Sequence, residues 1–146
     1  MRAVSPRRSA IVERDGPECV WCGRTPWPRD LTLEHLLPRS RGGHRTPANL
    51  APACRGCNRA RRSRPVAAYV RELLDAGRSP RVHTLEAALE RLGSSPRPAE
   101  RDYGARQLEL LRRVPAVPGH ARAAAERGTQ GSNLESPVLE TGALSN

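Results

Sequence analysis

The chain is poor in the residues that usually build a hydrophobic core. Its 146 residues include no phenylalanine, two tryptophans, two tyrosines and one methionine, and 37% of them are hydrophobic. At this length one domain with tails is the expected organisation. A core built from so few large side chains favours an additional staple, such as a bound metal ion.

Long apolar stretches are also absent from the sequence. No run approaches the roughly 18 residues that a membrane span requires. The N-terminal residues 1–16 are charged and lack the apolar centre of a signal peptide. We therefore expect a cytoplasmic protein that does not engage a membrane. In that compartment, paired cysteines indicate a metal site before they indicate disulfides.

Lysine does not occur, so all 25 basic residues are arginine, and the formal net charge is +10. Residues 1–65 contain 14 arginines and five acidic residues, whereas residues 66–146 contain 11 and ten. A general arginine bias explains part of this usage, but the excess lies almost entirely in the first half. A concentrated positive charge indicates a polyanionic partner, most simply nucleic acid.

Four cysteines form two Cys-x-x-Cys pairs, Cys19/Cys22 and Cys54/Cys57. Each pair lets two sulfurs approach one ion, and two pairs complete a tetrahedron. We predict a structural Zn²⁺ site, closed because all four positions are filled by cysteine. Four buried free thiols or a redox pair are the alternatives.

Short secondary-structure elements are expected around these cysteines. Alternating apolar residues predict a strand at 31–33, which places Glu34 and His35 near its end. The other expected elements are a helix over 9–15, a turn at Gly42-Gly43, a return strand at 49–51 and a helix from Cys54 to Arg64 that Pro65 ends.

The pattern changes after Pro65. Apolar residues at helical spacing predict one helix from Val66 that Gly77 closes, and a second with Thr84 as N-cap and Gly93 at its end. We expect these helices to form a structural hairpin. Residues 94–102 are expected to be a linker, 105–114 a possible third helix, and the chain from 115 onward disordered. The expected divisions are 1–65, 66–93 and 94–146.

Taken together, the motifs resemble those of HNH endonucleases with a ββα-metal core. The matching stretches are CVWCG, LEHLLPRSRGG, ANLAPACRGCN and the RARR that follows, within about residues 10–64. The resemblance implies an α+β fold, with a small ββα-metal core stapled by a zinc knuckle pair. A helical extension and a disordered C-terminal tail would follow this core.

The resemblance also implies the roles of four polar residues. His35 corresponds to the general base that takes a proton from water, since a neutral imidazole can do so at physiological pH. Glu34 and Asn58 correspond to two oxygen ligands of one divalent cation, Mg²⁺ or Mn²⁺. Asn49 would brace the loop and orient His35. The expected products carry 5′-phosphate and 3′-hydroxyl ends.

Two positions depart from the family pattern. Glu34 stands where most members carry Asp, and Arg61 stands where a Lys is frequent. The second change keeps the charge. The first adds a methylene to a presumed ligand, and Mg²⁺ tolerates displaced oxygens poorly whereas larger cations are more forgiving.

An arginine-rich surface is expected to contact the phosphate backbone of double-stranded DNA. Like charges on one short helix repel each other, and a phosphate backbone would relieve that repulsion. A solvated basic face is the alternative. The predicted contacts are Arg39, Arg41, Arg55, Arg59, Arg61, Arg62 and Arg64.

The predicted function is metal-dependent hydrolysis of DNA phosphodiester bonds. The main alternative is a zinc-stabilised DNA-binding module that kept the fold and lost the chemistry. A redox or zinc-storage protein ranks last, because it explains neither His35 nor Asn58. The DNA sequence cut, the biological role and the oligomeric state do not follow from these residues, since arginine contacts to phosphate carry no sequence information.

Overall fold

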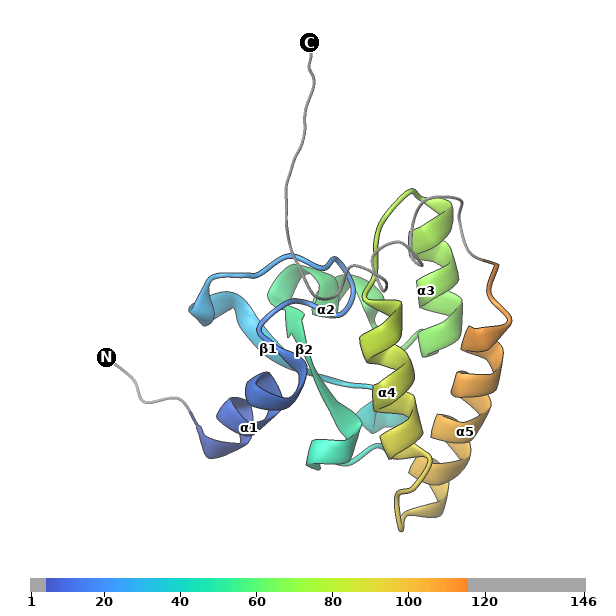
Figure 1. Cartoon of the computed structure of the whole chain (residues 1–146). Coiled ribbons are helices and arrows are strands. Elements are labelled where there is room, and N and C mark those ends of the chain that lie inside the picture. The colour runs from blue at the N-terminus through green and yellow to red at the C-terminus, as the bar shows by residue number, and fades with distance from the viewer. Residues whose placement is uncertain (1–4, 116–146) are drawn as a thin grey trace.

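The computed structural model describes residues 5–115. A small sheet with two helices lies beside a group of three helices (Figure 1). In chain order the elements are α1 (Pro6–Asp15), β1 (Leu31–His35), β2 (Leu50–Cys54), α2 (Arg55–Arg61), α3 (Val66–Asp75), α4 (Val82–Leu92) and α5 (Pro98–Arg112).

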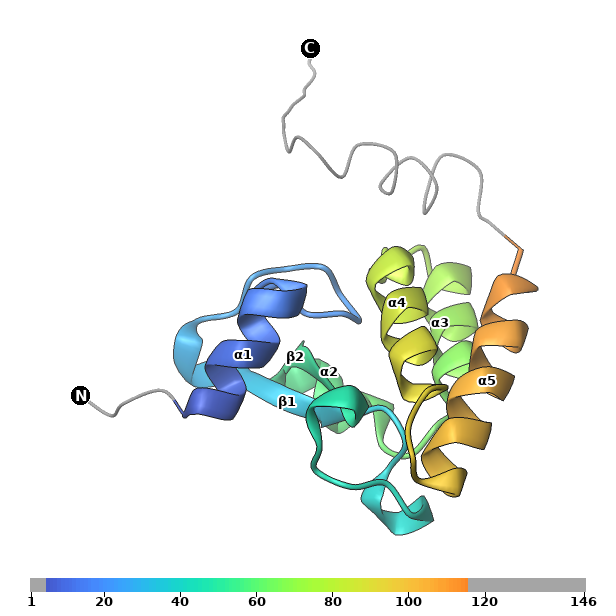
Figure 2. The same cartoon turned by 60° about the horizontal axis from the view of Figure 1, so that its bottom comes forward.

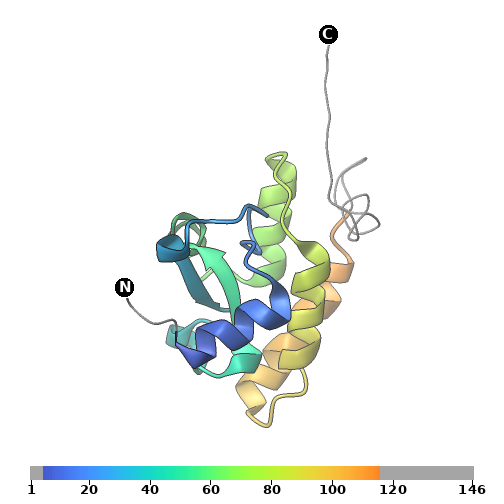
Figure 3. The same cartoon turned by 60° about the vertical axis from the view of Figure 1, so that its left-hand side comes forward.

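β1 and β2 form an antiparallel pair in which Leu31 faces Cys54 and His35 faces Leu50. α2 follows β2 without a linker, and α1 packs against β2 (Figures 2 and 3). This arrangement confirms the α+β fold with a ββα unit. Glu34 and His35 are the last two residues of β1, as predicted.

Capping interactions define α1. The side chain of Ser5 accepts a hydrogen bond from the Arg8 amide (3.1 Å), and Pro6 occupies the first turn, where a missing N–H costs nothing. Ile11 is buried. The helix ends at Gly16, whose φ of 88° suits glycine. It therefore begins three residues before the predicted start at Ser9.

α2 is shorter than predicted. It ends at Arg61 because Arg62 adopts a φ of 59°, so the chain turns away three residues before Arg64. The predicted cap of α4 is also wrong: the helix already begins at Val82, and Thr84 lies inside it. Asn49 belongs to a 3₁₀ turn, Pro47–Asn49, and β2 starts at the next residue.

α5 replaces most of the predicted linker. It begins at Pro98, so only 93–97 connect it to α4, and it packs on both α3 and α4. Gly104 permits this close packing, because a Cβ there would lie 2.5 Å from the Gly93 amide nitrogen. The residues from 116 onward, for which disorder was predicted, lie outside the described part.

One hydrophobic core joins the sheet to the helices. Trp21, Leu36 and Ala53 of the N-terminal part share it with Val70 and Leu89 of α3 and α4. The predicted division at residue 65 therefore does not separate two cores. Within residues 5–115, no helix combines the length and apolar character that a bilayer span would need.

Candidate active site and metal centre

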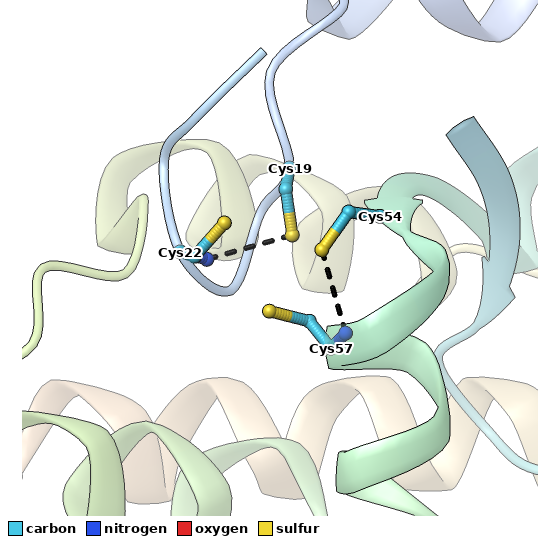
Figure 4. A group of neighbouring side chains, drawn as sticks. All are labelled: Cys19, Cys22, Cys54 and Cys57. Carbon is cyan, nitrogen blue, oxygen red and sulfur yellow. Dashed lines mark hydrogen bonds between the residues drawn. The ribbon is translucent and has the colours of Figure 1, made fainter. Parts of the chain in front are cut away.

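The four cysteines converge from two separate segments (Figure 4). Cys19 and Cys22 come from the loop after α1, Cys54 ends β2 and Cys57 lies in the first turn of α2. Their sulfur atoms all lie within 4.8 Å of one another, and none forms a disulfide. Tetrahedral Zn²⁺ with bonds of about 2.3 Å places its sulfurs about 3.8 Å apart. The cluster therefore fits a structural zinc ion.

Hydrogen bonds prepare these sulfurs to carry negative charge. The backbone amides of Trp21 and Cys22 donate to Cys19 Sγ (3.3 and 3.5 Å), and the Cys57 amide donates to Cys54 Sγ (3.4 Å). The Cys57 thiol, followed by backbone donors, lowers the pKa of Cys19 to about 5 although burial opposes the shift. Such donors favour the thiolate, which is the form that binds zinc.

His35 is half-buried at the end of β1. Burial, and then the positive charges of Arg45 and Arg39, lower the pKa of its imidazole, while Glu100 acts in the opposite direction. Its Nε2 is shielded from solvent and has no hydrogen-bond partner among the described residues. The lowered pKa favours the neutral form of the ring, which is the form that can accept a proton.

Asn49 braces the loop between β1 and β2. Its Oδ1 accepts from the Leu37 amide (2.8 Å), and its Nδ2 donates to the carbonyls of Leu37 and His44 (both 3.0 Å). Gly43 completes this packing, since a Cβ there would lie 1.8 Å from the Leu37 carbonyl oxygen. Asn49 is fully buried, so it supports the loop that follows His35 and does not reach a substrate.

Glu34 is the second predicted site residue on β1, and it is nearly closed to solvent. Its Oε2 accepts a hydrogen bond from Trp21 Nε1 (2.9 Å) and forms an ion pair with Arg61 Nη1 (3.2 Å). Burial raises the pKa of Glu34, while Arg61 and Trp21 act to lower it. The carboxylate therefore already has a cation beside it.

The prediction that Arg61 contacts DNA is wrong, because its side chain is completely buried. Besides the pair with Glu34, the guanidinium donates to the carbonyls of His35 (2.8 Å) and Leu36 (2.7 Å). It also donates to the Arg64 carbonyl (2.8 Å) and the Tyr103 hydroxyl (3.3 Å). Arg61 positions the end of β1 instead of binding a phosphate.

Asn58 lies against the same face of β1 as Glu34. Its Nδ2 donates to Thr32 Oγ1 (2.9 Å), and Thr32 and Glu34, two residues apart on a strand, share one face. The carboxylate of Glu34 and the amide oxygen of Asn58 belong to the class of oxygen donors that divalent cations such as Mg²⁺ prefer. Arg61 is a competing positive charge beside them. His35, the next residue of β1, lies near other charged residues, namely Arg45, Arg39 and Glu100.

The other arginines predicted to contact DNA differ in their exposure and in their ion pairs. Arg39, Arg41, Arg59 and Arg62 are exposed. Arg55 pairs with Asp30 (3.7 Å) and keeps half of its side chain exposed, and Arg64 pairs with Glu72. An open groove of about 640 Å³ runs beside the end of α2, lined by Gly56, Arg59, Ala60, Arg62, Ser63 and Arg64.

Two residues of α5 contribute to the site without any sequence signal. Glu100 is buried and accepts from the His44 amide (3.0 Å) and the Ser95 hydroxyl (2.9 Å), so it holds the Gly-Gly loop. Tyr103 accepts from the Val66 amide (3.2 Å) besides its bond with Arg61. Neither residue belongs to a motif, and Glu100 is 56 positions from His44 while Tyr103 is 42 positions from Arg61.

The chain is similar to known proteins in sequence and in structure. A family model described as HNH endonuclease matches residues 19–74. The crystal structure of the Type II-C Cas9 enzyme from Actinomyces naeslundii is similar, with 22% sequence identity and a TM-score of 0.46. That match covers 79% of this chain, which spans 12% of the other chain's length. No curated protein matches the chain.

We predict that the purified protein contains about one zinc ion per chain, as a four-cysteine site requires. A chelator, or Cys22→Ser, should lower the melting temperature, because the ion links the loop after α1 to α2. Elemental analysis and thermal melting measure the two effects, with zinc re-addition to the chelated protein as the control. A metal-free protein with an unchanged melting temperature would contradict the assignment.

We also predict that Arg61→Met lowers the free energy of unfolding by about 3–5 kcal/mol, because it leaves the buried Glu34 carboxylate unpaired. Arg59→Met is the matched control on the exposed side of the same helix, with an expected change within about 0.5 kcal/mol. Chemical denaturation at fixed zinc concentration measures both. Similar changes in the two variants would show that the buried ion pair does not stabilise the fold.

Proposed function

Because residues 19–74 belong to the HNH endonuclease family, we propose that this chain is a metal-dependent endonuclease that hydrolyses DNA phosphodiester bonds. The observation that carries the proposal is the position of His35, half-buried at the end of β1 beside the exposed Arg39 and Arg45, where burial and these charges lower the pKa of its imidazole. A base that is uncharged near neutral pH, next to groups that attract phosphate, suits phosphodiester hydrolysis.

In this proposal His35 acts as the general base. A neutral imidazole has a nitrogen lone pair that can accept the proton of a water molecule, and burial and two nearby arginines lower the pKa of His35. The water oxygen then attacks phosphorus in line with the departing 3′ oxygen. Arg61 and Asn49 take no part in the transfer. They fix the backbone on either side of the imidazole.

Glu34 and Asn58 are the residues that would hold the divalent cation, Mg²⁺ or Mn²⁺. Such a cation would offset the negative charge that develops on the phosphoryl oxygens and on the leaving oxygen. The Glu34 oxygen that faces Trp21 and Arg61 would orient the carboxylate, as hydrogen bonds to ligating carboxylates commonly do. The other carboxylate oxygen and the Asn58 amide oxygen would be the ligands.

Double-stranded DNA is the proposed partner. The exposed Arg39 and Arg41 follow β1, and the exposed Arg59 and Arg62 line the groove beside α2. Neutralisation of phosphates by these side chains would supply affinity without reading the base sequence. Arg55 and Arg64 can add to this surface, because each keeps an exposed part of its side chain.

A zinc-stabilised DNA-binding module without catalytic activity is the second candidate. One observation favours it: Arg61 already neutralises Glu34, the carboxylate that should bind the catalytic cation. Binding a divalent cation would place a second positive charge near the first, which is unfavourable in a poorly solvated site. The two functions differ only in cleavage, so a cleavage assay separates them.

We expect the wild-type protein to nick supercoiled plasmid with Mg²⁺ or Mn²⁺ and not without a divalent cation. His35→Ala should reduce nicking by about 100-fold or more, since general base catalysis contributes factors of roughly 10² to 10⁴. Its affinity in a gel shift at fixed salt should change little, because the arginines supply most of the affinity. Wild-type rates in the His35→Ala protein would refute the role of this residue.

The same assay tests Glu34 through a nearly isosteric change. Glu34→Gln keeps an oxygen that can accept from Trp21 and Arg61 but loses the negative charge. If Glu34 is a ligand, nicking should fall sharply while DNA binding persists. If the wild-type protein binds DNA and cuts it with neither cation, the DNA-binding module becomes the assigned function.

The pH dependence of nicking should reflect His35. Because burial and the two arginines lower its pKa, the acidic limb of kcat/KM should have its midpoint below about 6.5, the usual value for histidine. Arg45→Gln should move the midpoint upward, since it removes one of these positive charges. The lowered pKa of His35 in the wild-type protein also affects stability. As the pH falls below about 6.5, the unfolded chain binds the proton more tightly than the folded chain, so His35 lowers the free energy of unfolding. A midpoint that Arg45→Gln does not move would contradict this account.

A further inference from the structure

Trp27 takes no part in the proposed cleavage, and its side chain is largely exposed. Its exposed fraction is 71%, and it is the one large hydrophobic residue that is exposed among residues 5–115. The other tryptophan, Trp21, is fully buried. An exposed indole costs free energy in water, so a rigid loop that presents one indicates a contact surface.

The loop around Trp27 is held firmly by both neighbouring helices. Arg8 of α1 donates to the carbonyls of Pro28 (2.6 Å) and Leu31, and Arg55 of α2 donates to the carbonyl of Arg29 (2.7 Å). The Asp30 amide donates to the Trp27 carbonyl (2.8 Å). Pro26 and Pro28 restrict the backbone on either side. The backbone that carries the exposed indole is therefore held in place.

Positive charge surrounds this indole and continues along α2. Arg24 and Arg29 flank it in the loop and are exposed. Arg55 contacts the loop backbone, and the next residue, Gly56, opens the groove that Arg59 and Arg62 line. An exposed aromatic ring interleaved with arginines matches the chemistry of a nucleic-acid strand, whose bases stack on rings and whose phosphates pair with arginine.

We propose that Trp27 is a stacking platform for an unpaired base, on a DNA strand whose phosphates follow the arginine groove of α2. The proposal rests on the proposed function, in which nucleic acid is the partner. In a continuous duplex each base face is covered by its neighbours, so an indole can stack only where that stacking is broken. Trp27 would therefore direct the protein to DNA with a short single-stranded segment, such as a gap.

The test measures binding without a divalent cation, so that it is independent of cleavage. Two fluorescently labelled ligands are compared at fixed salt: a relaxed, covalently closed duplex circle without loops or ends, and the same duplex circle with a gap of a few nucleotides in one strand. The wild-type protein should bind the gapped duplex more tightly. Trp27→Ala should weaken binding to the gapped duplex by roughly 5- to 100-fold, as loss of one base–aromatic stack does, and should leave the closed duplex unchanged.

Trp27→Phe is the matched variant, because it keeps a ring that can stack and should retain most of the preference for the gap. The intrinsic fluorescence of tryptophan gives a second measurement. Since Trp21 is buried, quenching on addition of gapped DNA should come from Trp27 and disappear in Trp27→Phe. Thermal melting should be unchanged in both variants, because the side chain makes little contact with the core.

Three outcomes would overturn the proposal, and they are distinguishable. Equal losses for both ligands in Trp27→Ala would show a general contact and leave the proposed function standing. A change from dimer to monomer in Trp27→Ala with unchanged DNA binding would show that the loop binds a second copy of the chain. If the wild-type protein binds neither ligand at low salt, both the proposed function and this inference fail.

Discussion

The structure depends on one buried cation, the guanidinium of Arg61. A charge without solvent access must find partners for all of its donors, or it costs several kcal/mol. Arg61 finds them in three parts of the chain: Glu34 and the carbonyls at the end of β1, the Arg64 carbonyl, and the Tyr103 hydroxyl in α5. Its guanidinium also lies 5.3 Å from the ring of Trp21. Through Arg61, helix α2 thus holds the backbone of His35, the proposed base, in place.

The cysteine cluster and the helical extension both compensate for the small hydrophobic core. A core without phenylalanine can bury little area per residue, so neither the ββα unit nor the three helices has a large interior alone. Trp21 links them, since it lies between two cysteine ligands and packs edge-on against Tyr69 of α3 at 5.0 Å. Its indole N–H reaches Glu34. A metal ion at the cysteines therefore also fixes the ring on which the Glu34 carboxylate depends.

The sequence predicts the parts of the site that are local and misses those that are not. The cysteine spacing and the strand that places His35 near its end follow from short motifs, the role of Asn49 follows from the family resemblance, and in the structure the cysteines converge and Asn49 makes hydrogen bonds within the loop. The burial of Arg61 does not follow, because an arginine in a run of arginines looks like its exposed neighbours. Apart from the Arg64 carbonyl, its partners are 25 or more residues away, at the end of β1 and in α5. The contribution of α5 was missed for the same reason, since Glu100 and Tyr103 carry no periodic signal.

The pair of Glu34 and Arg61 also constrains how a cation could work in this site. A carboxylate that is shared between a guanidinium and a divalent ion attracts each less strongly than it would attract one alone. A phosphate entering from the arginine surface brings negative charge to the same place and reduces the repulsion between the two cations. In the proposed function, the cation and the DNA would therefore strengthen each other's binding, and that coupling would be reciprocal.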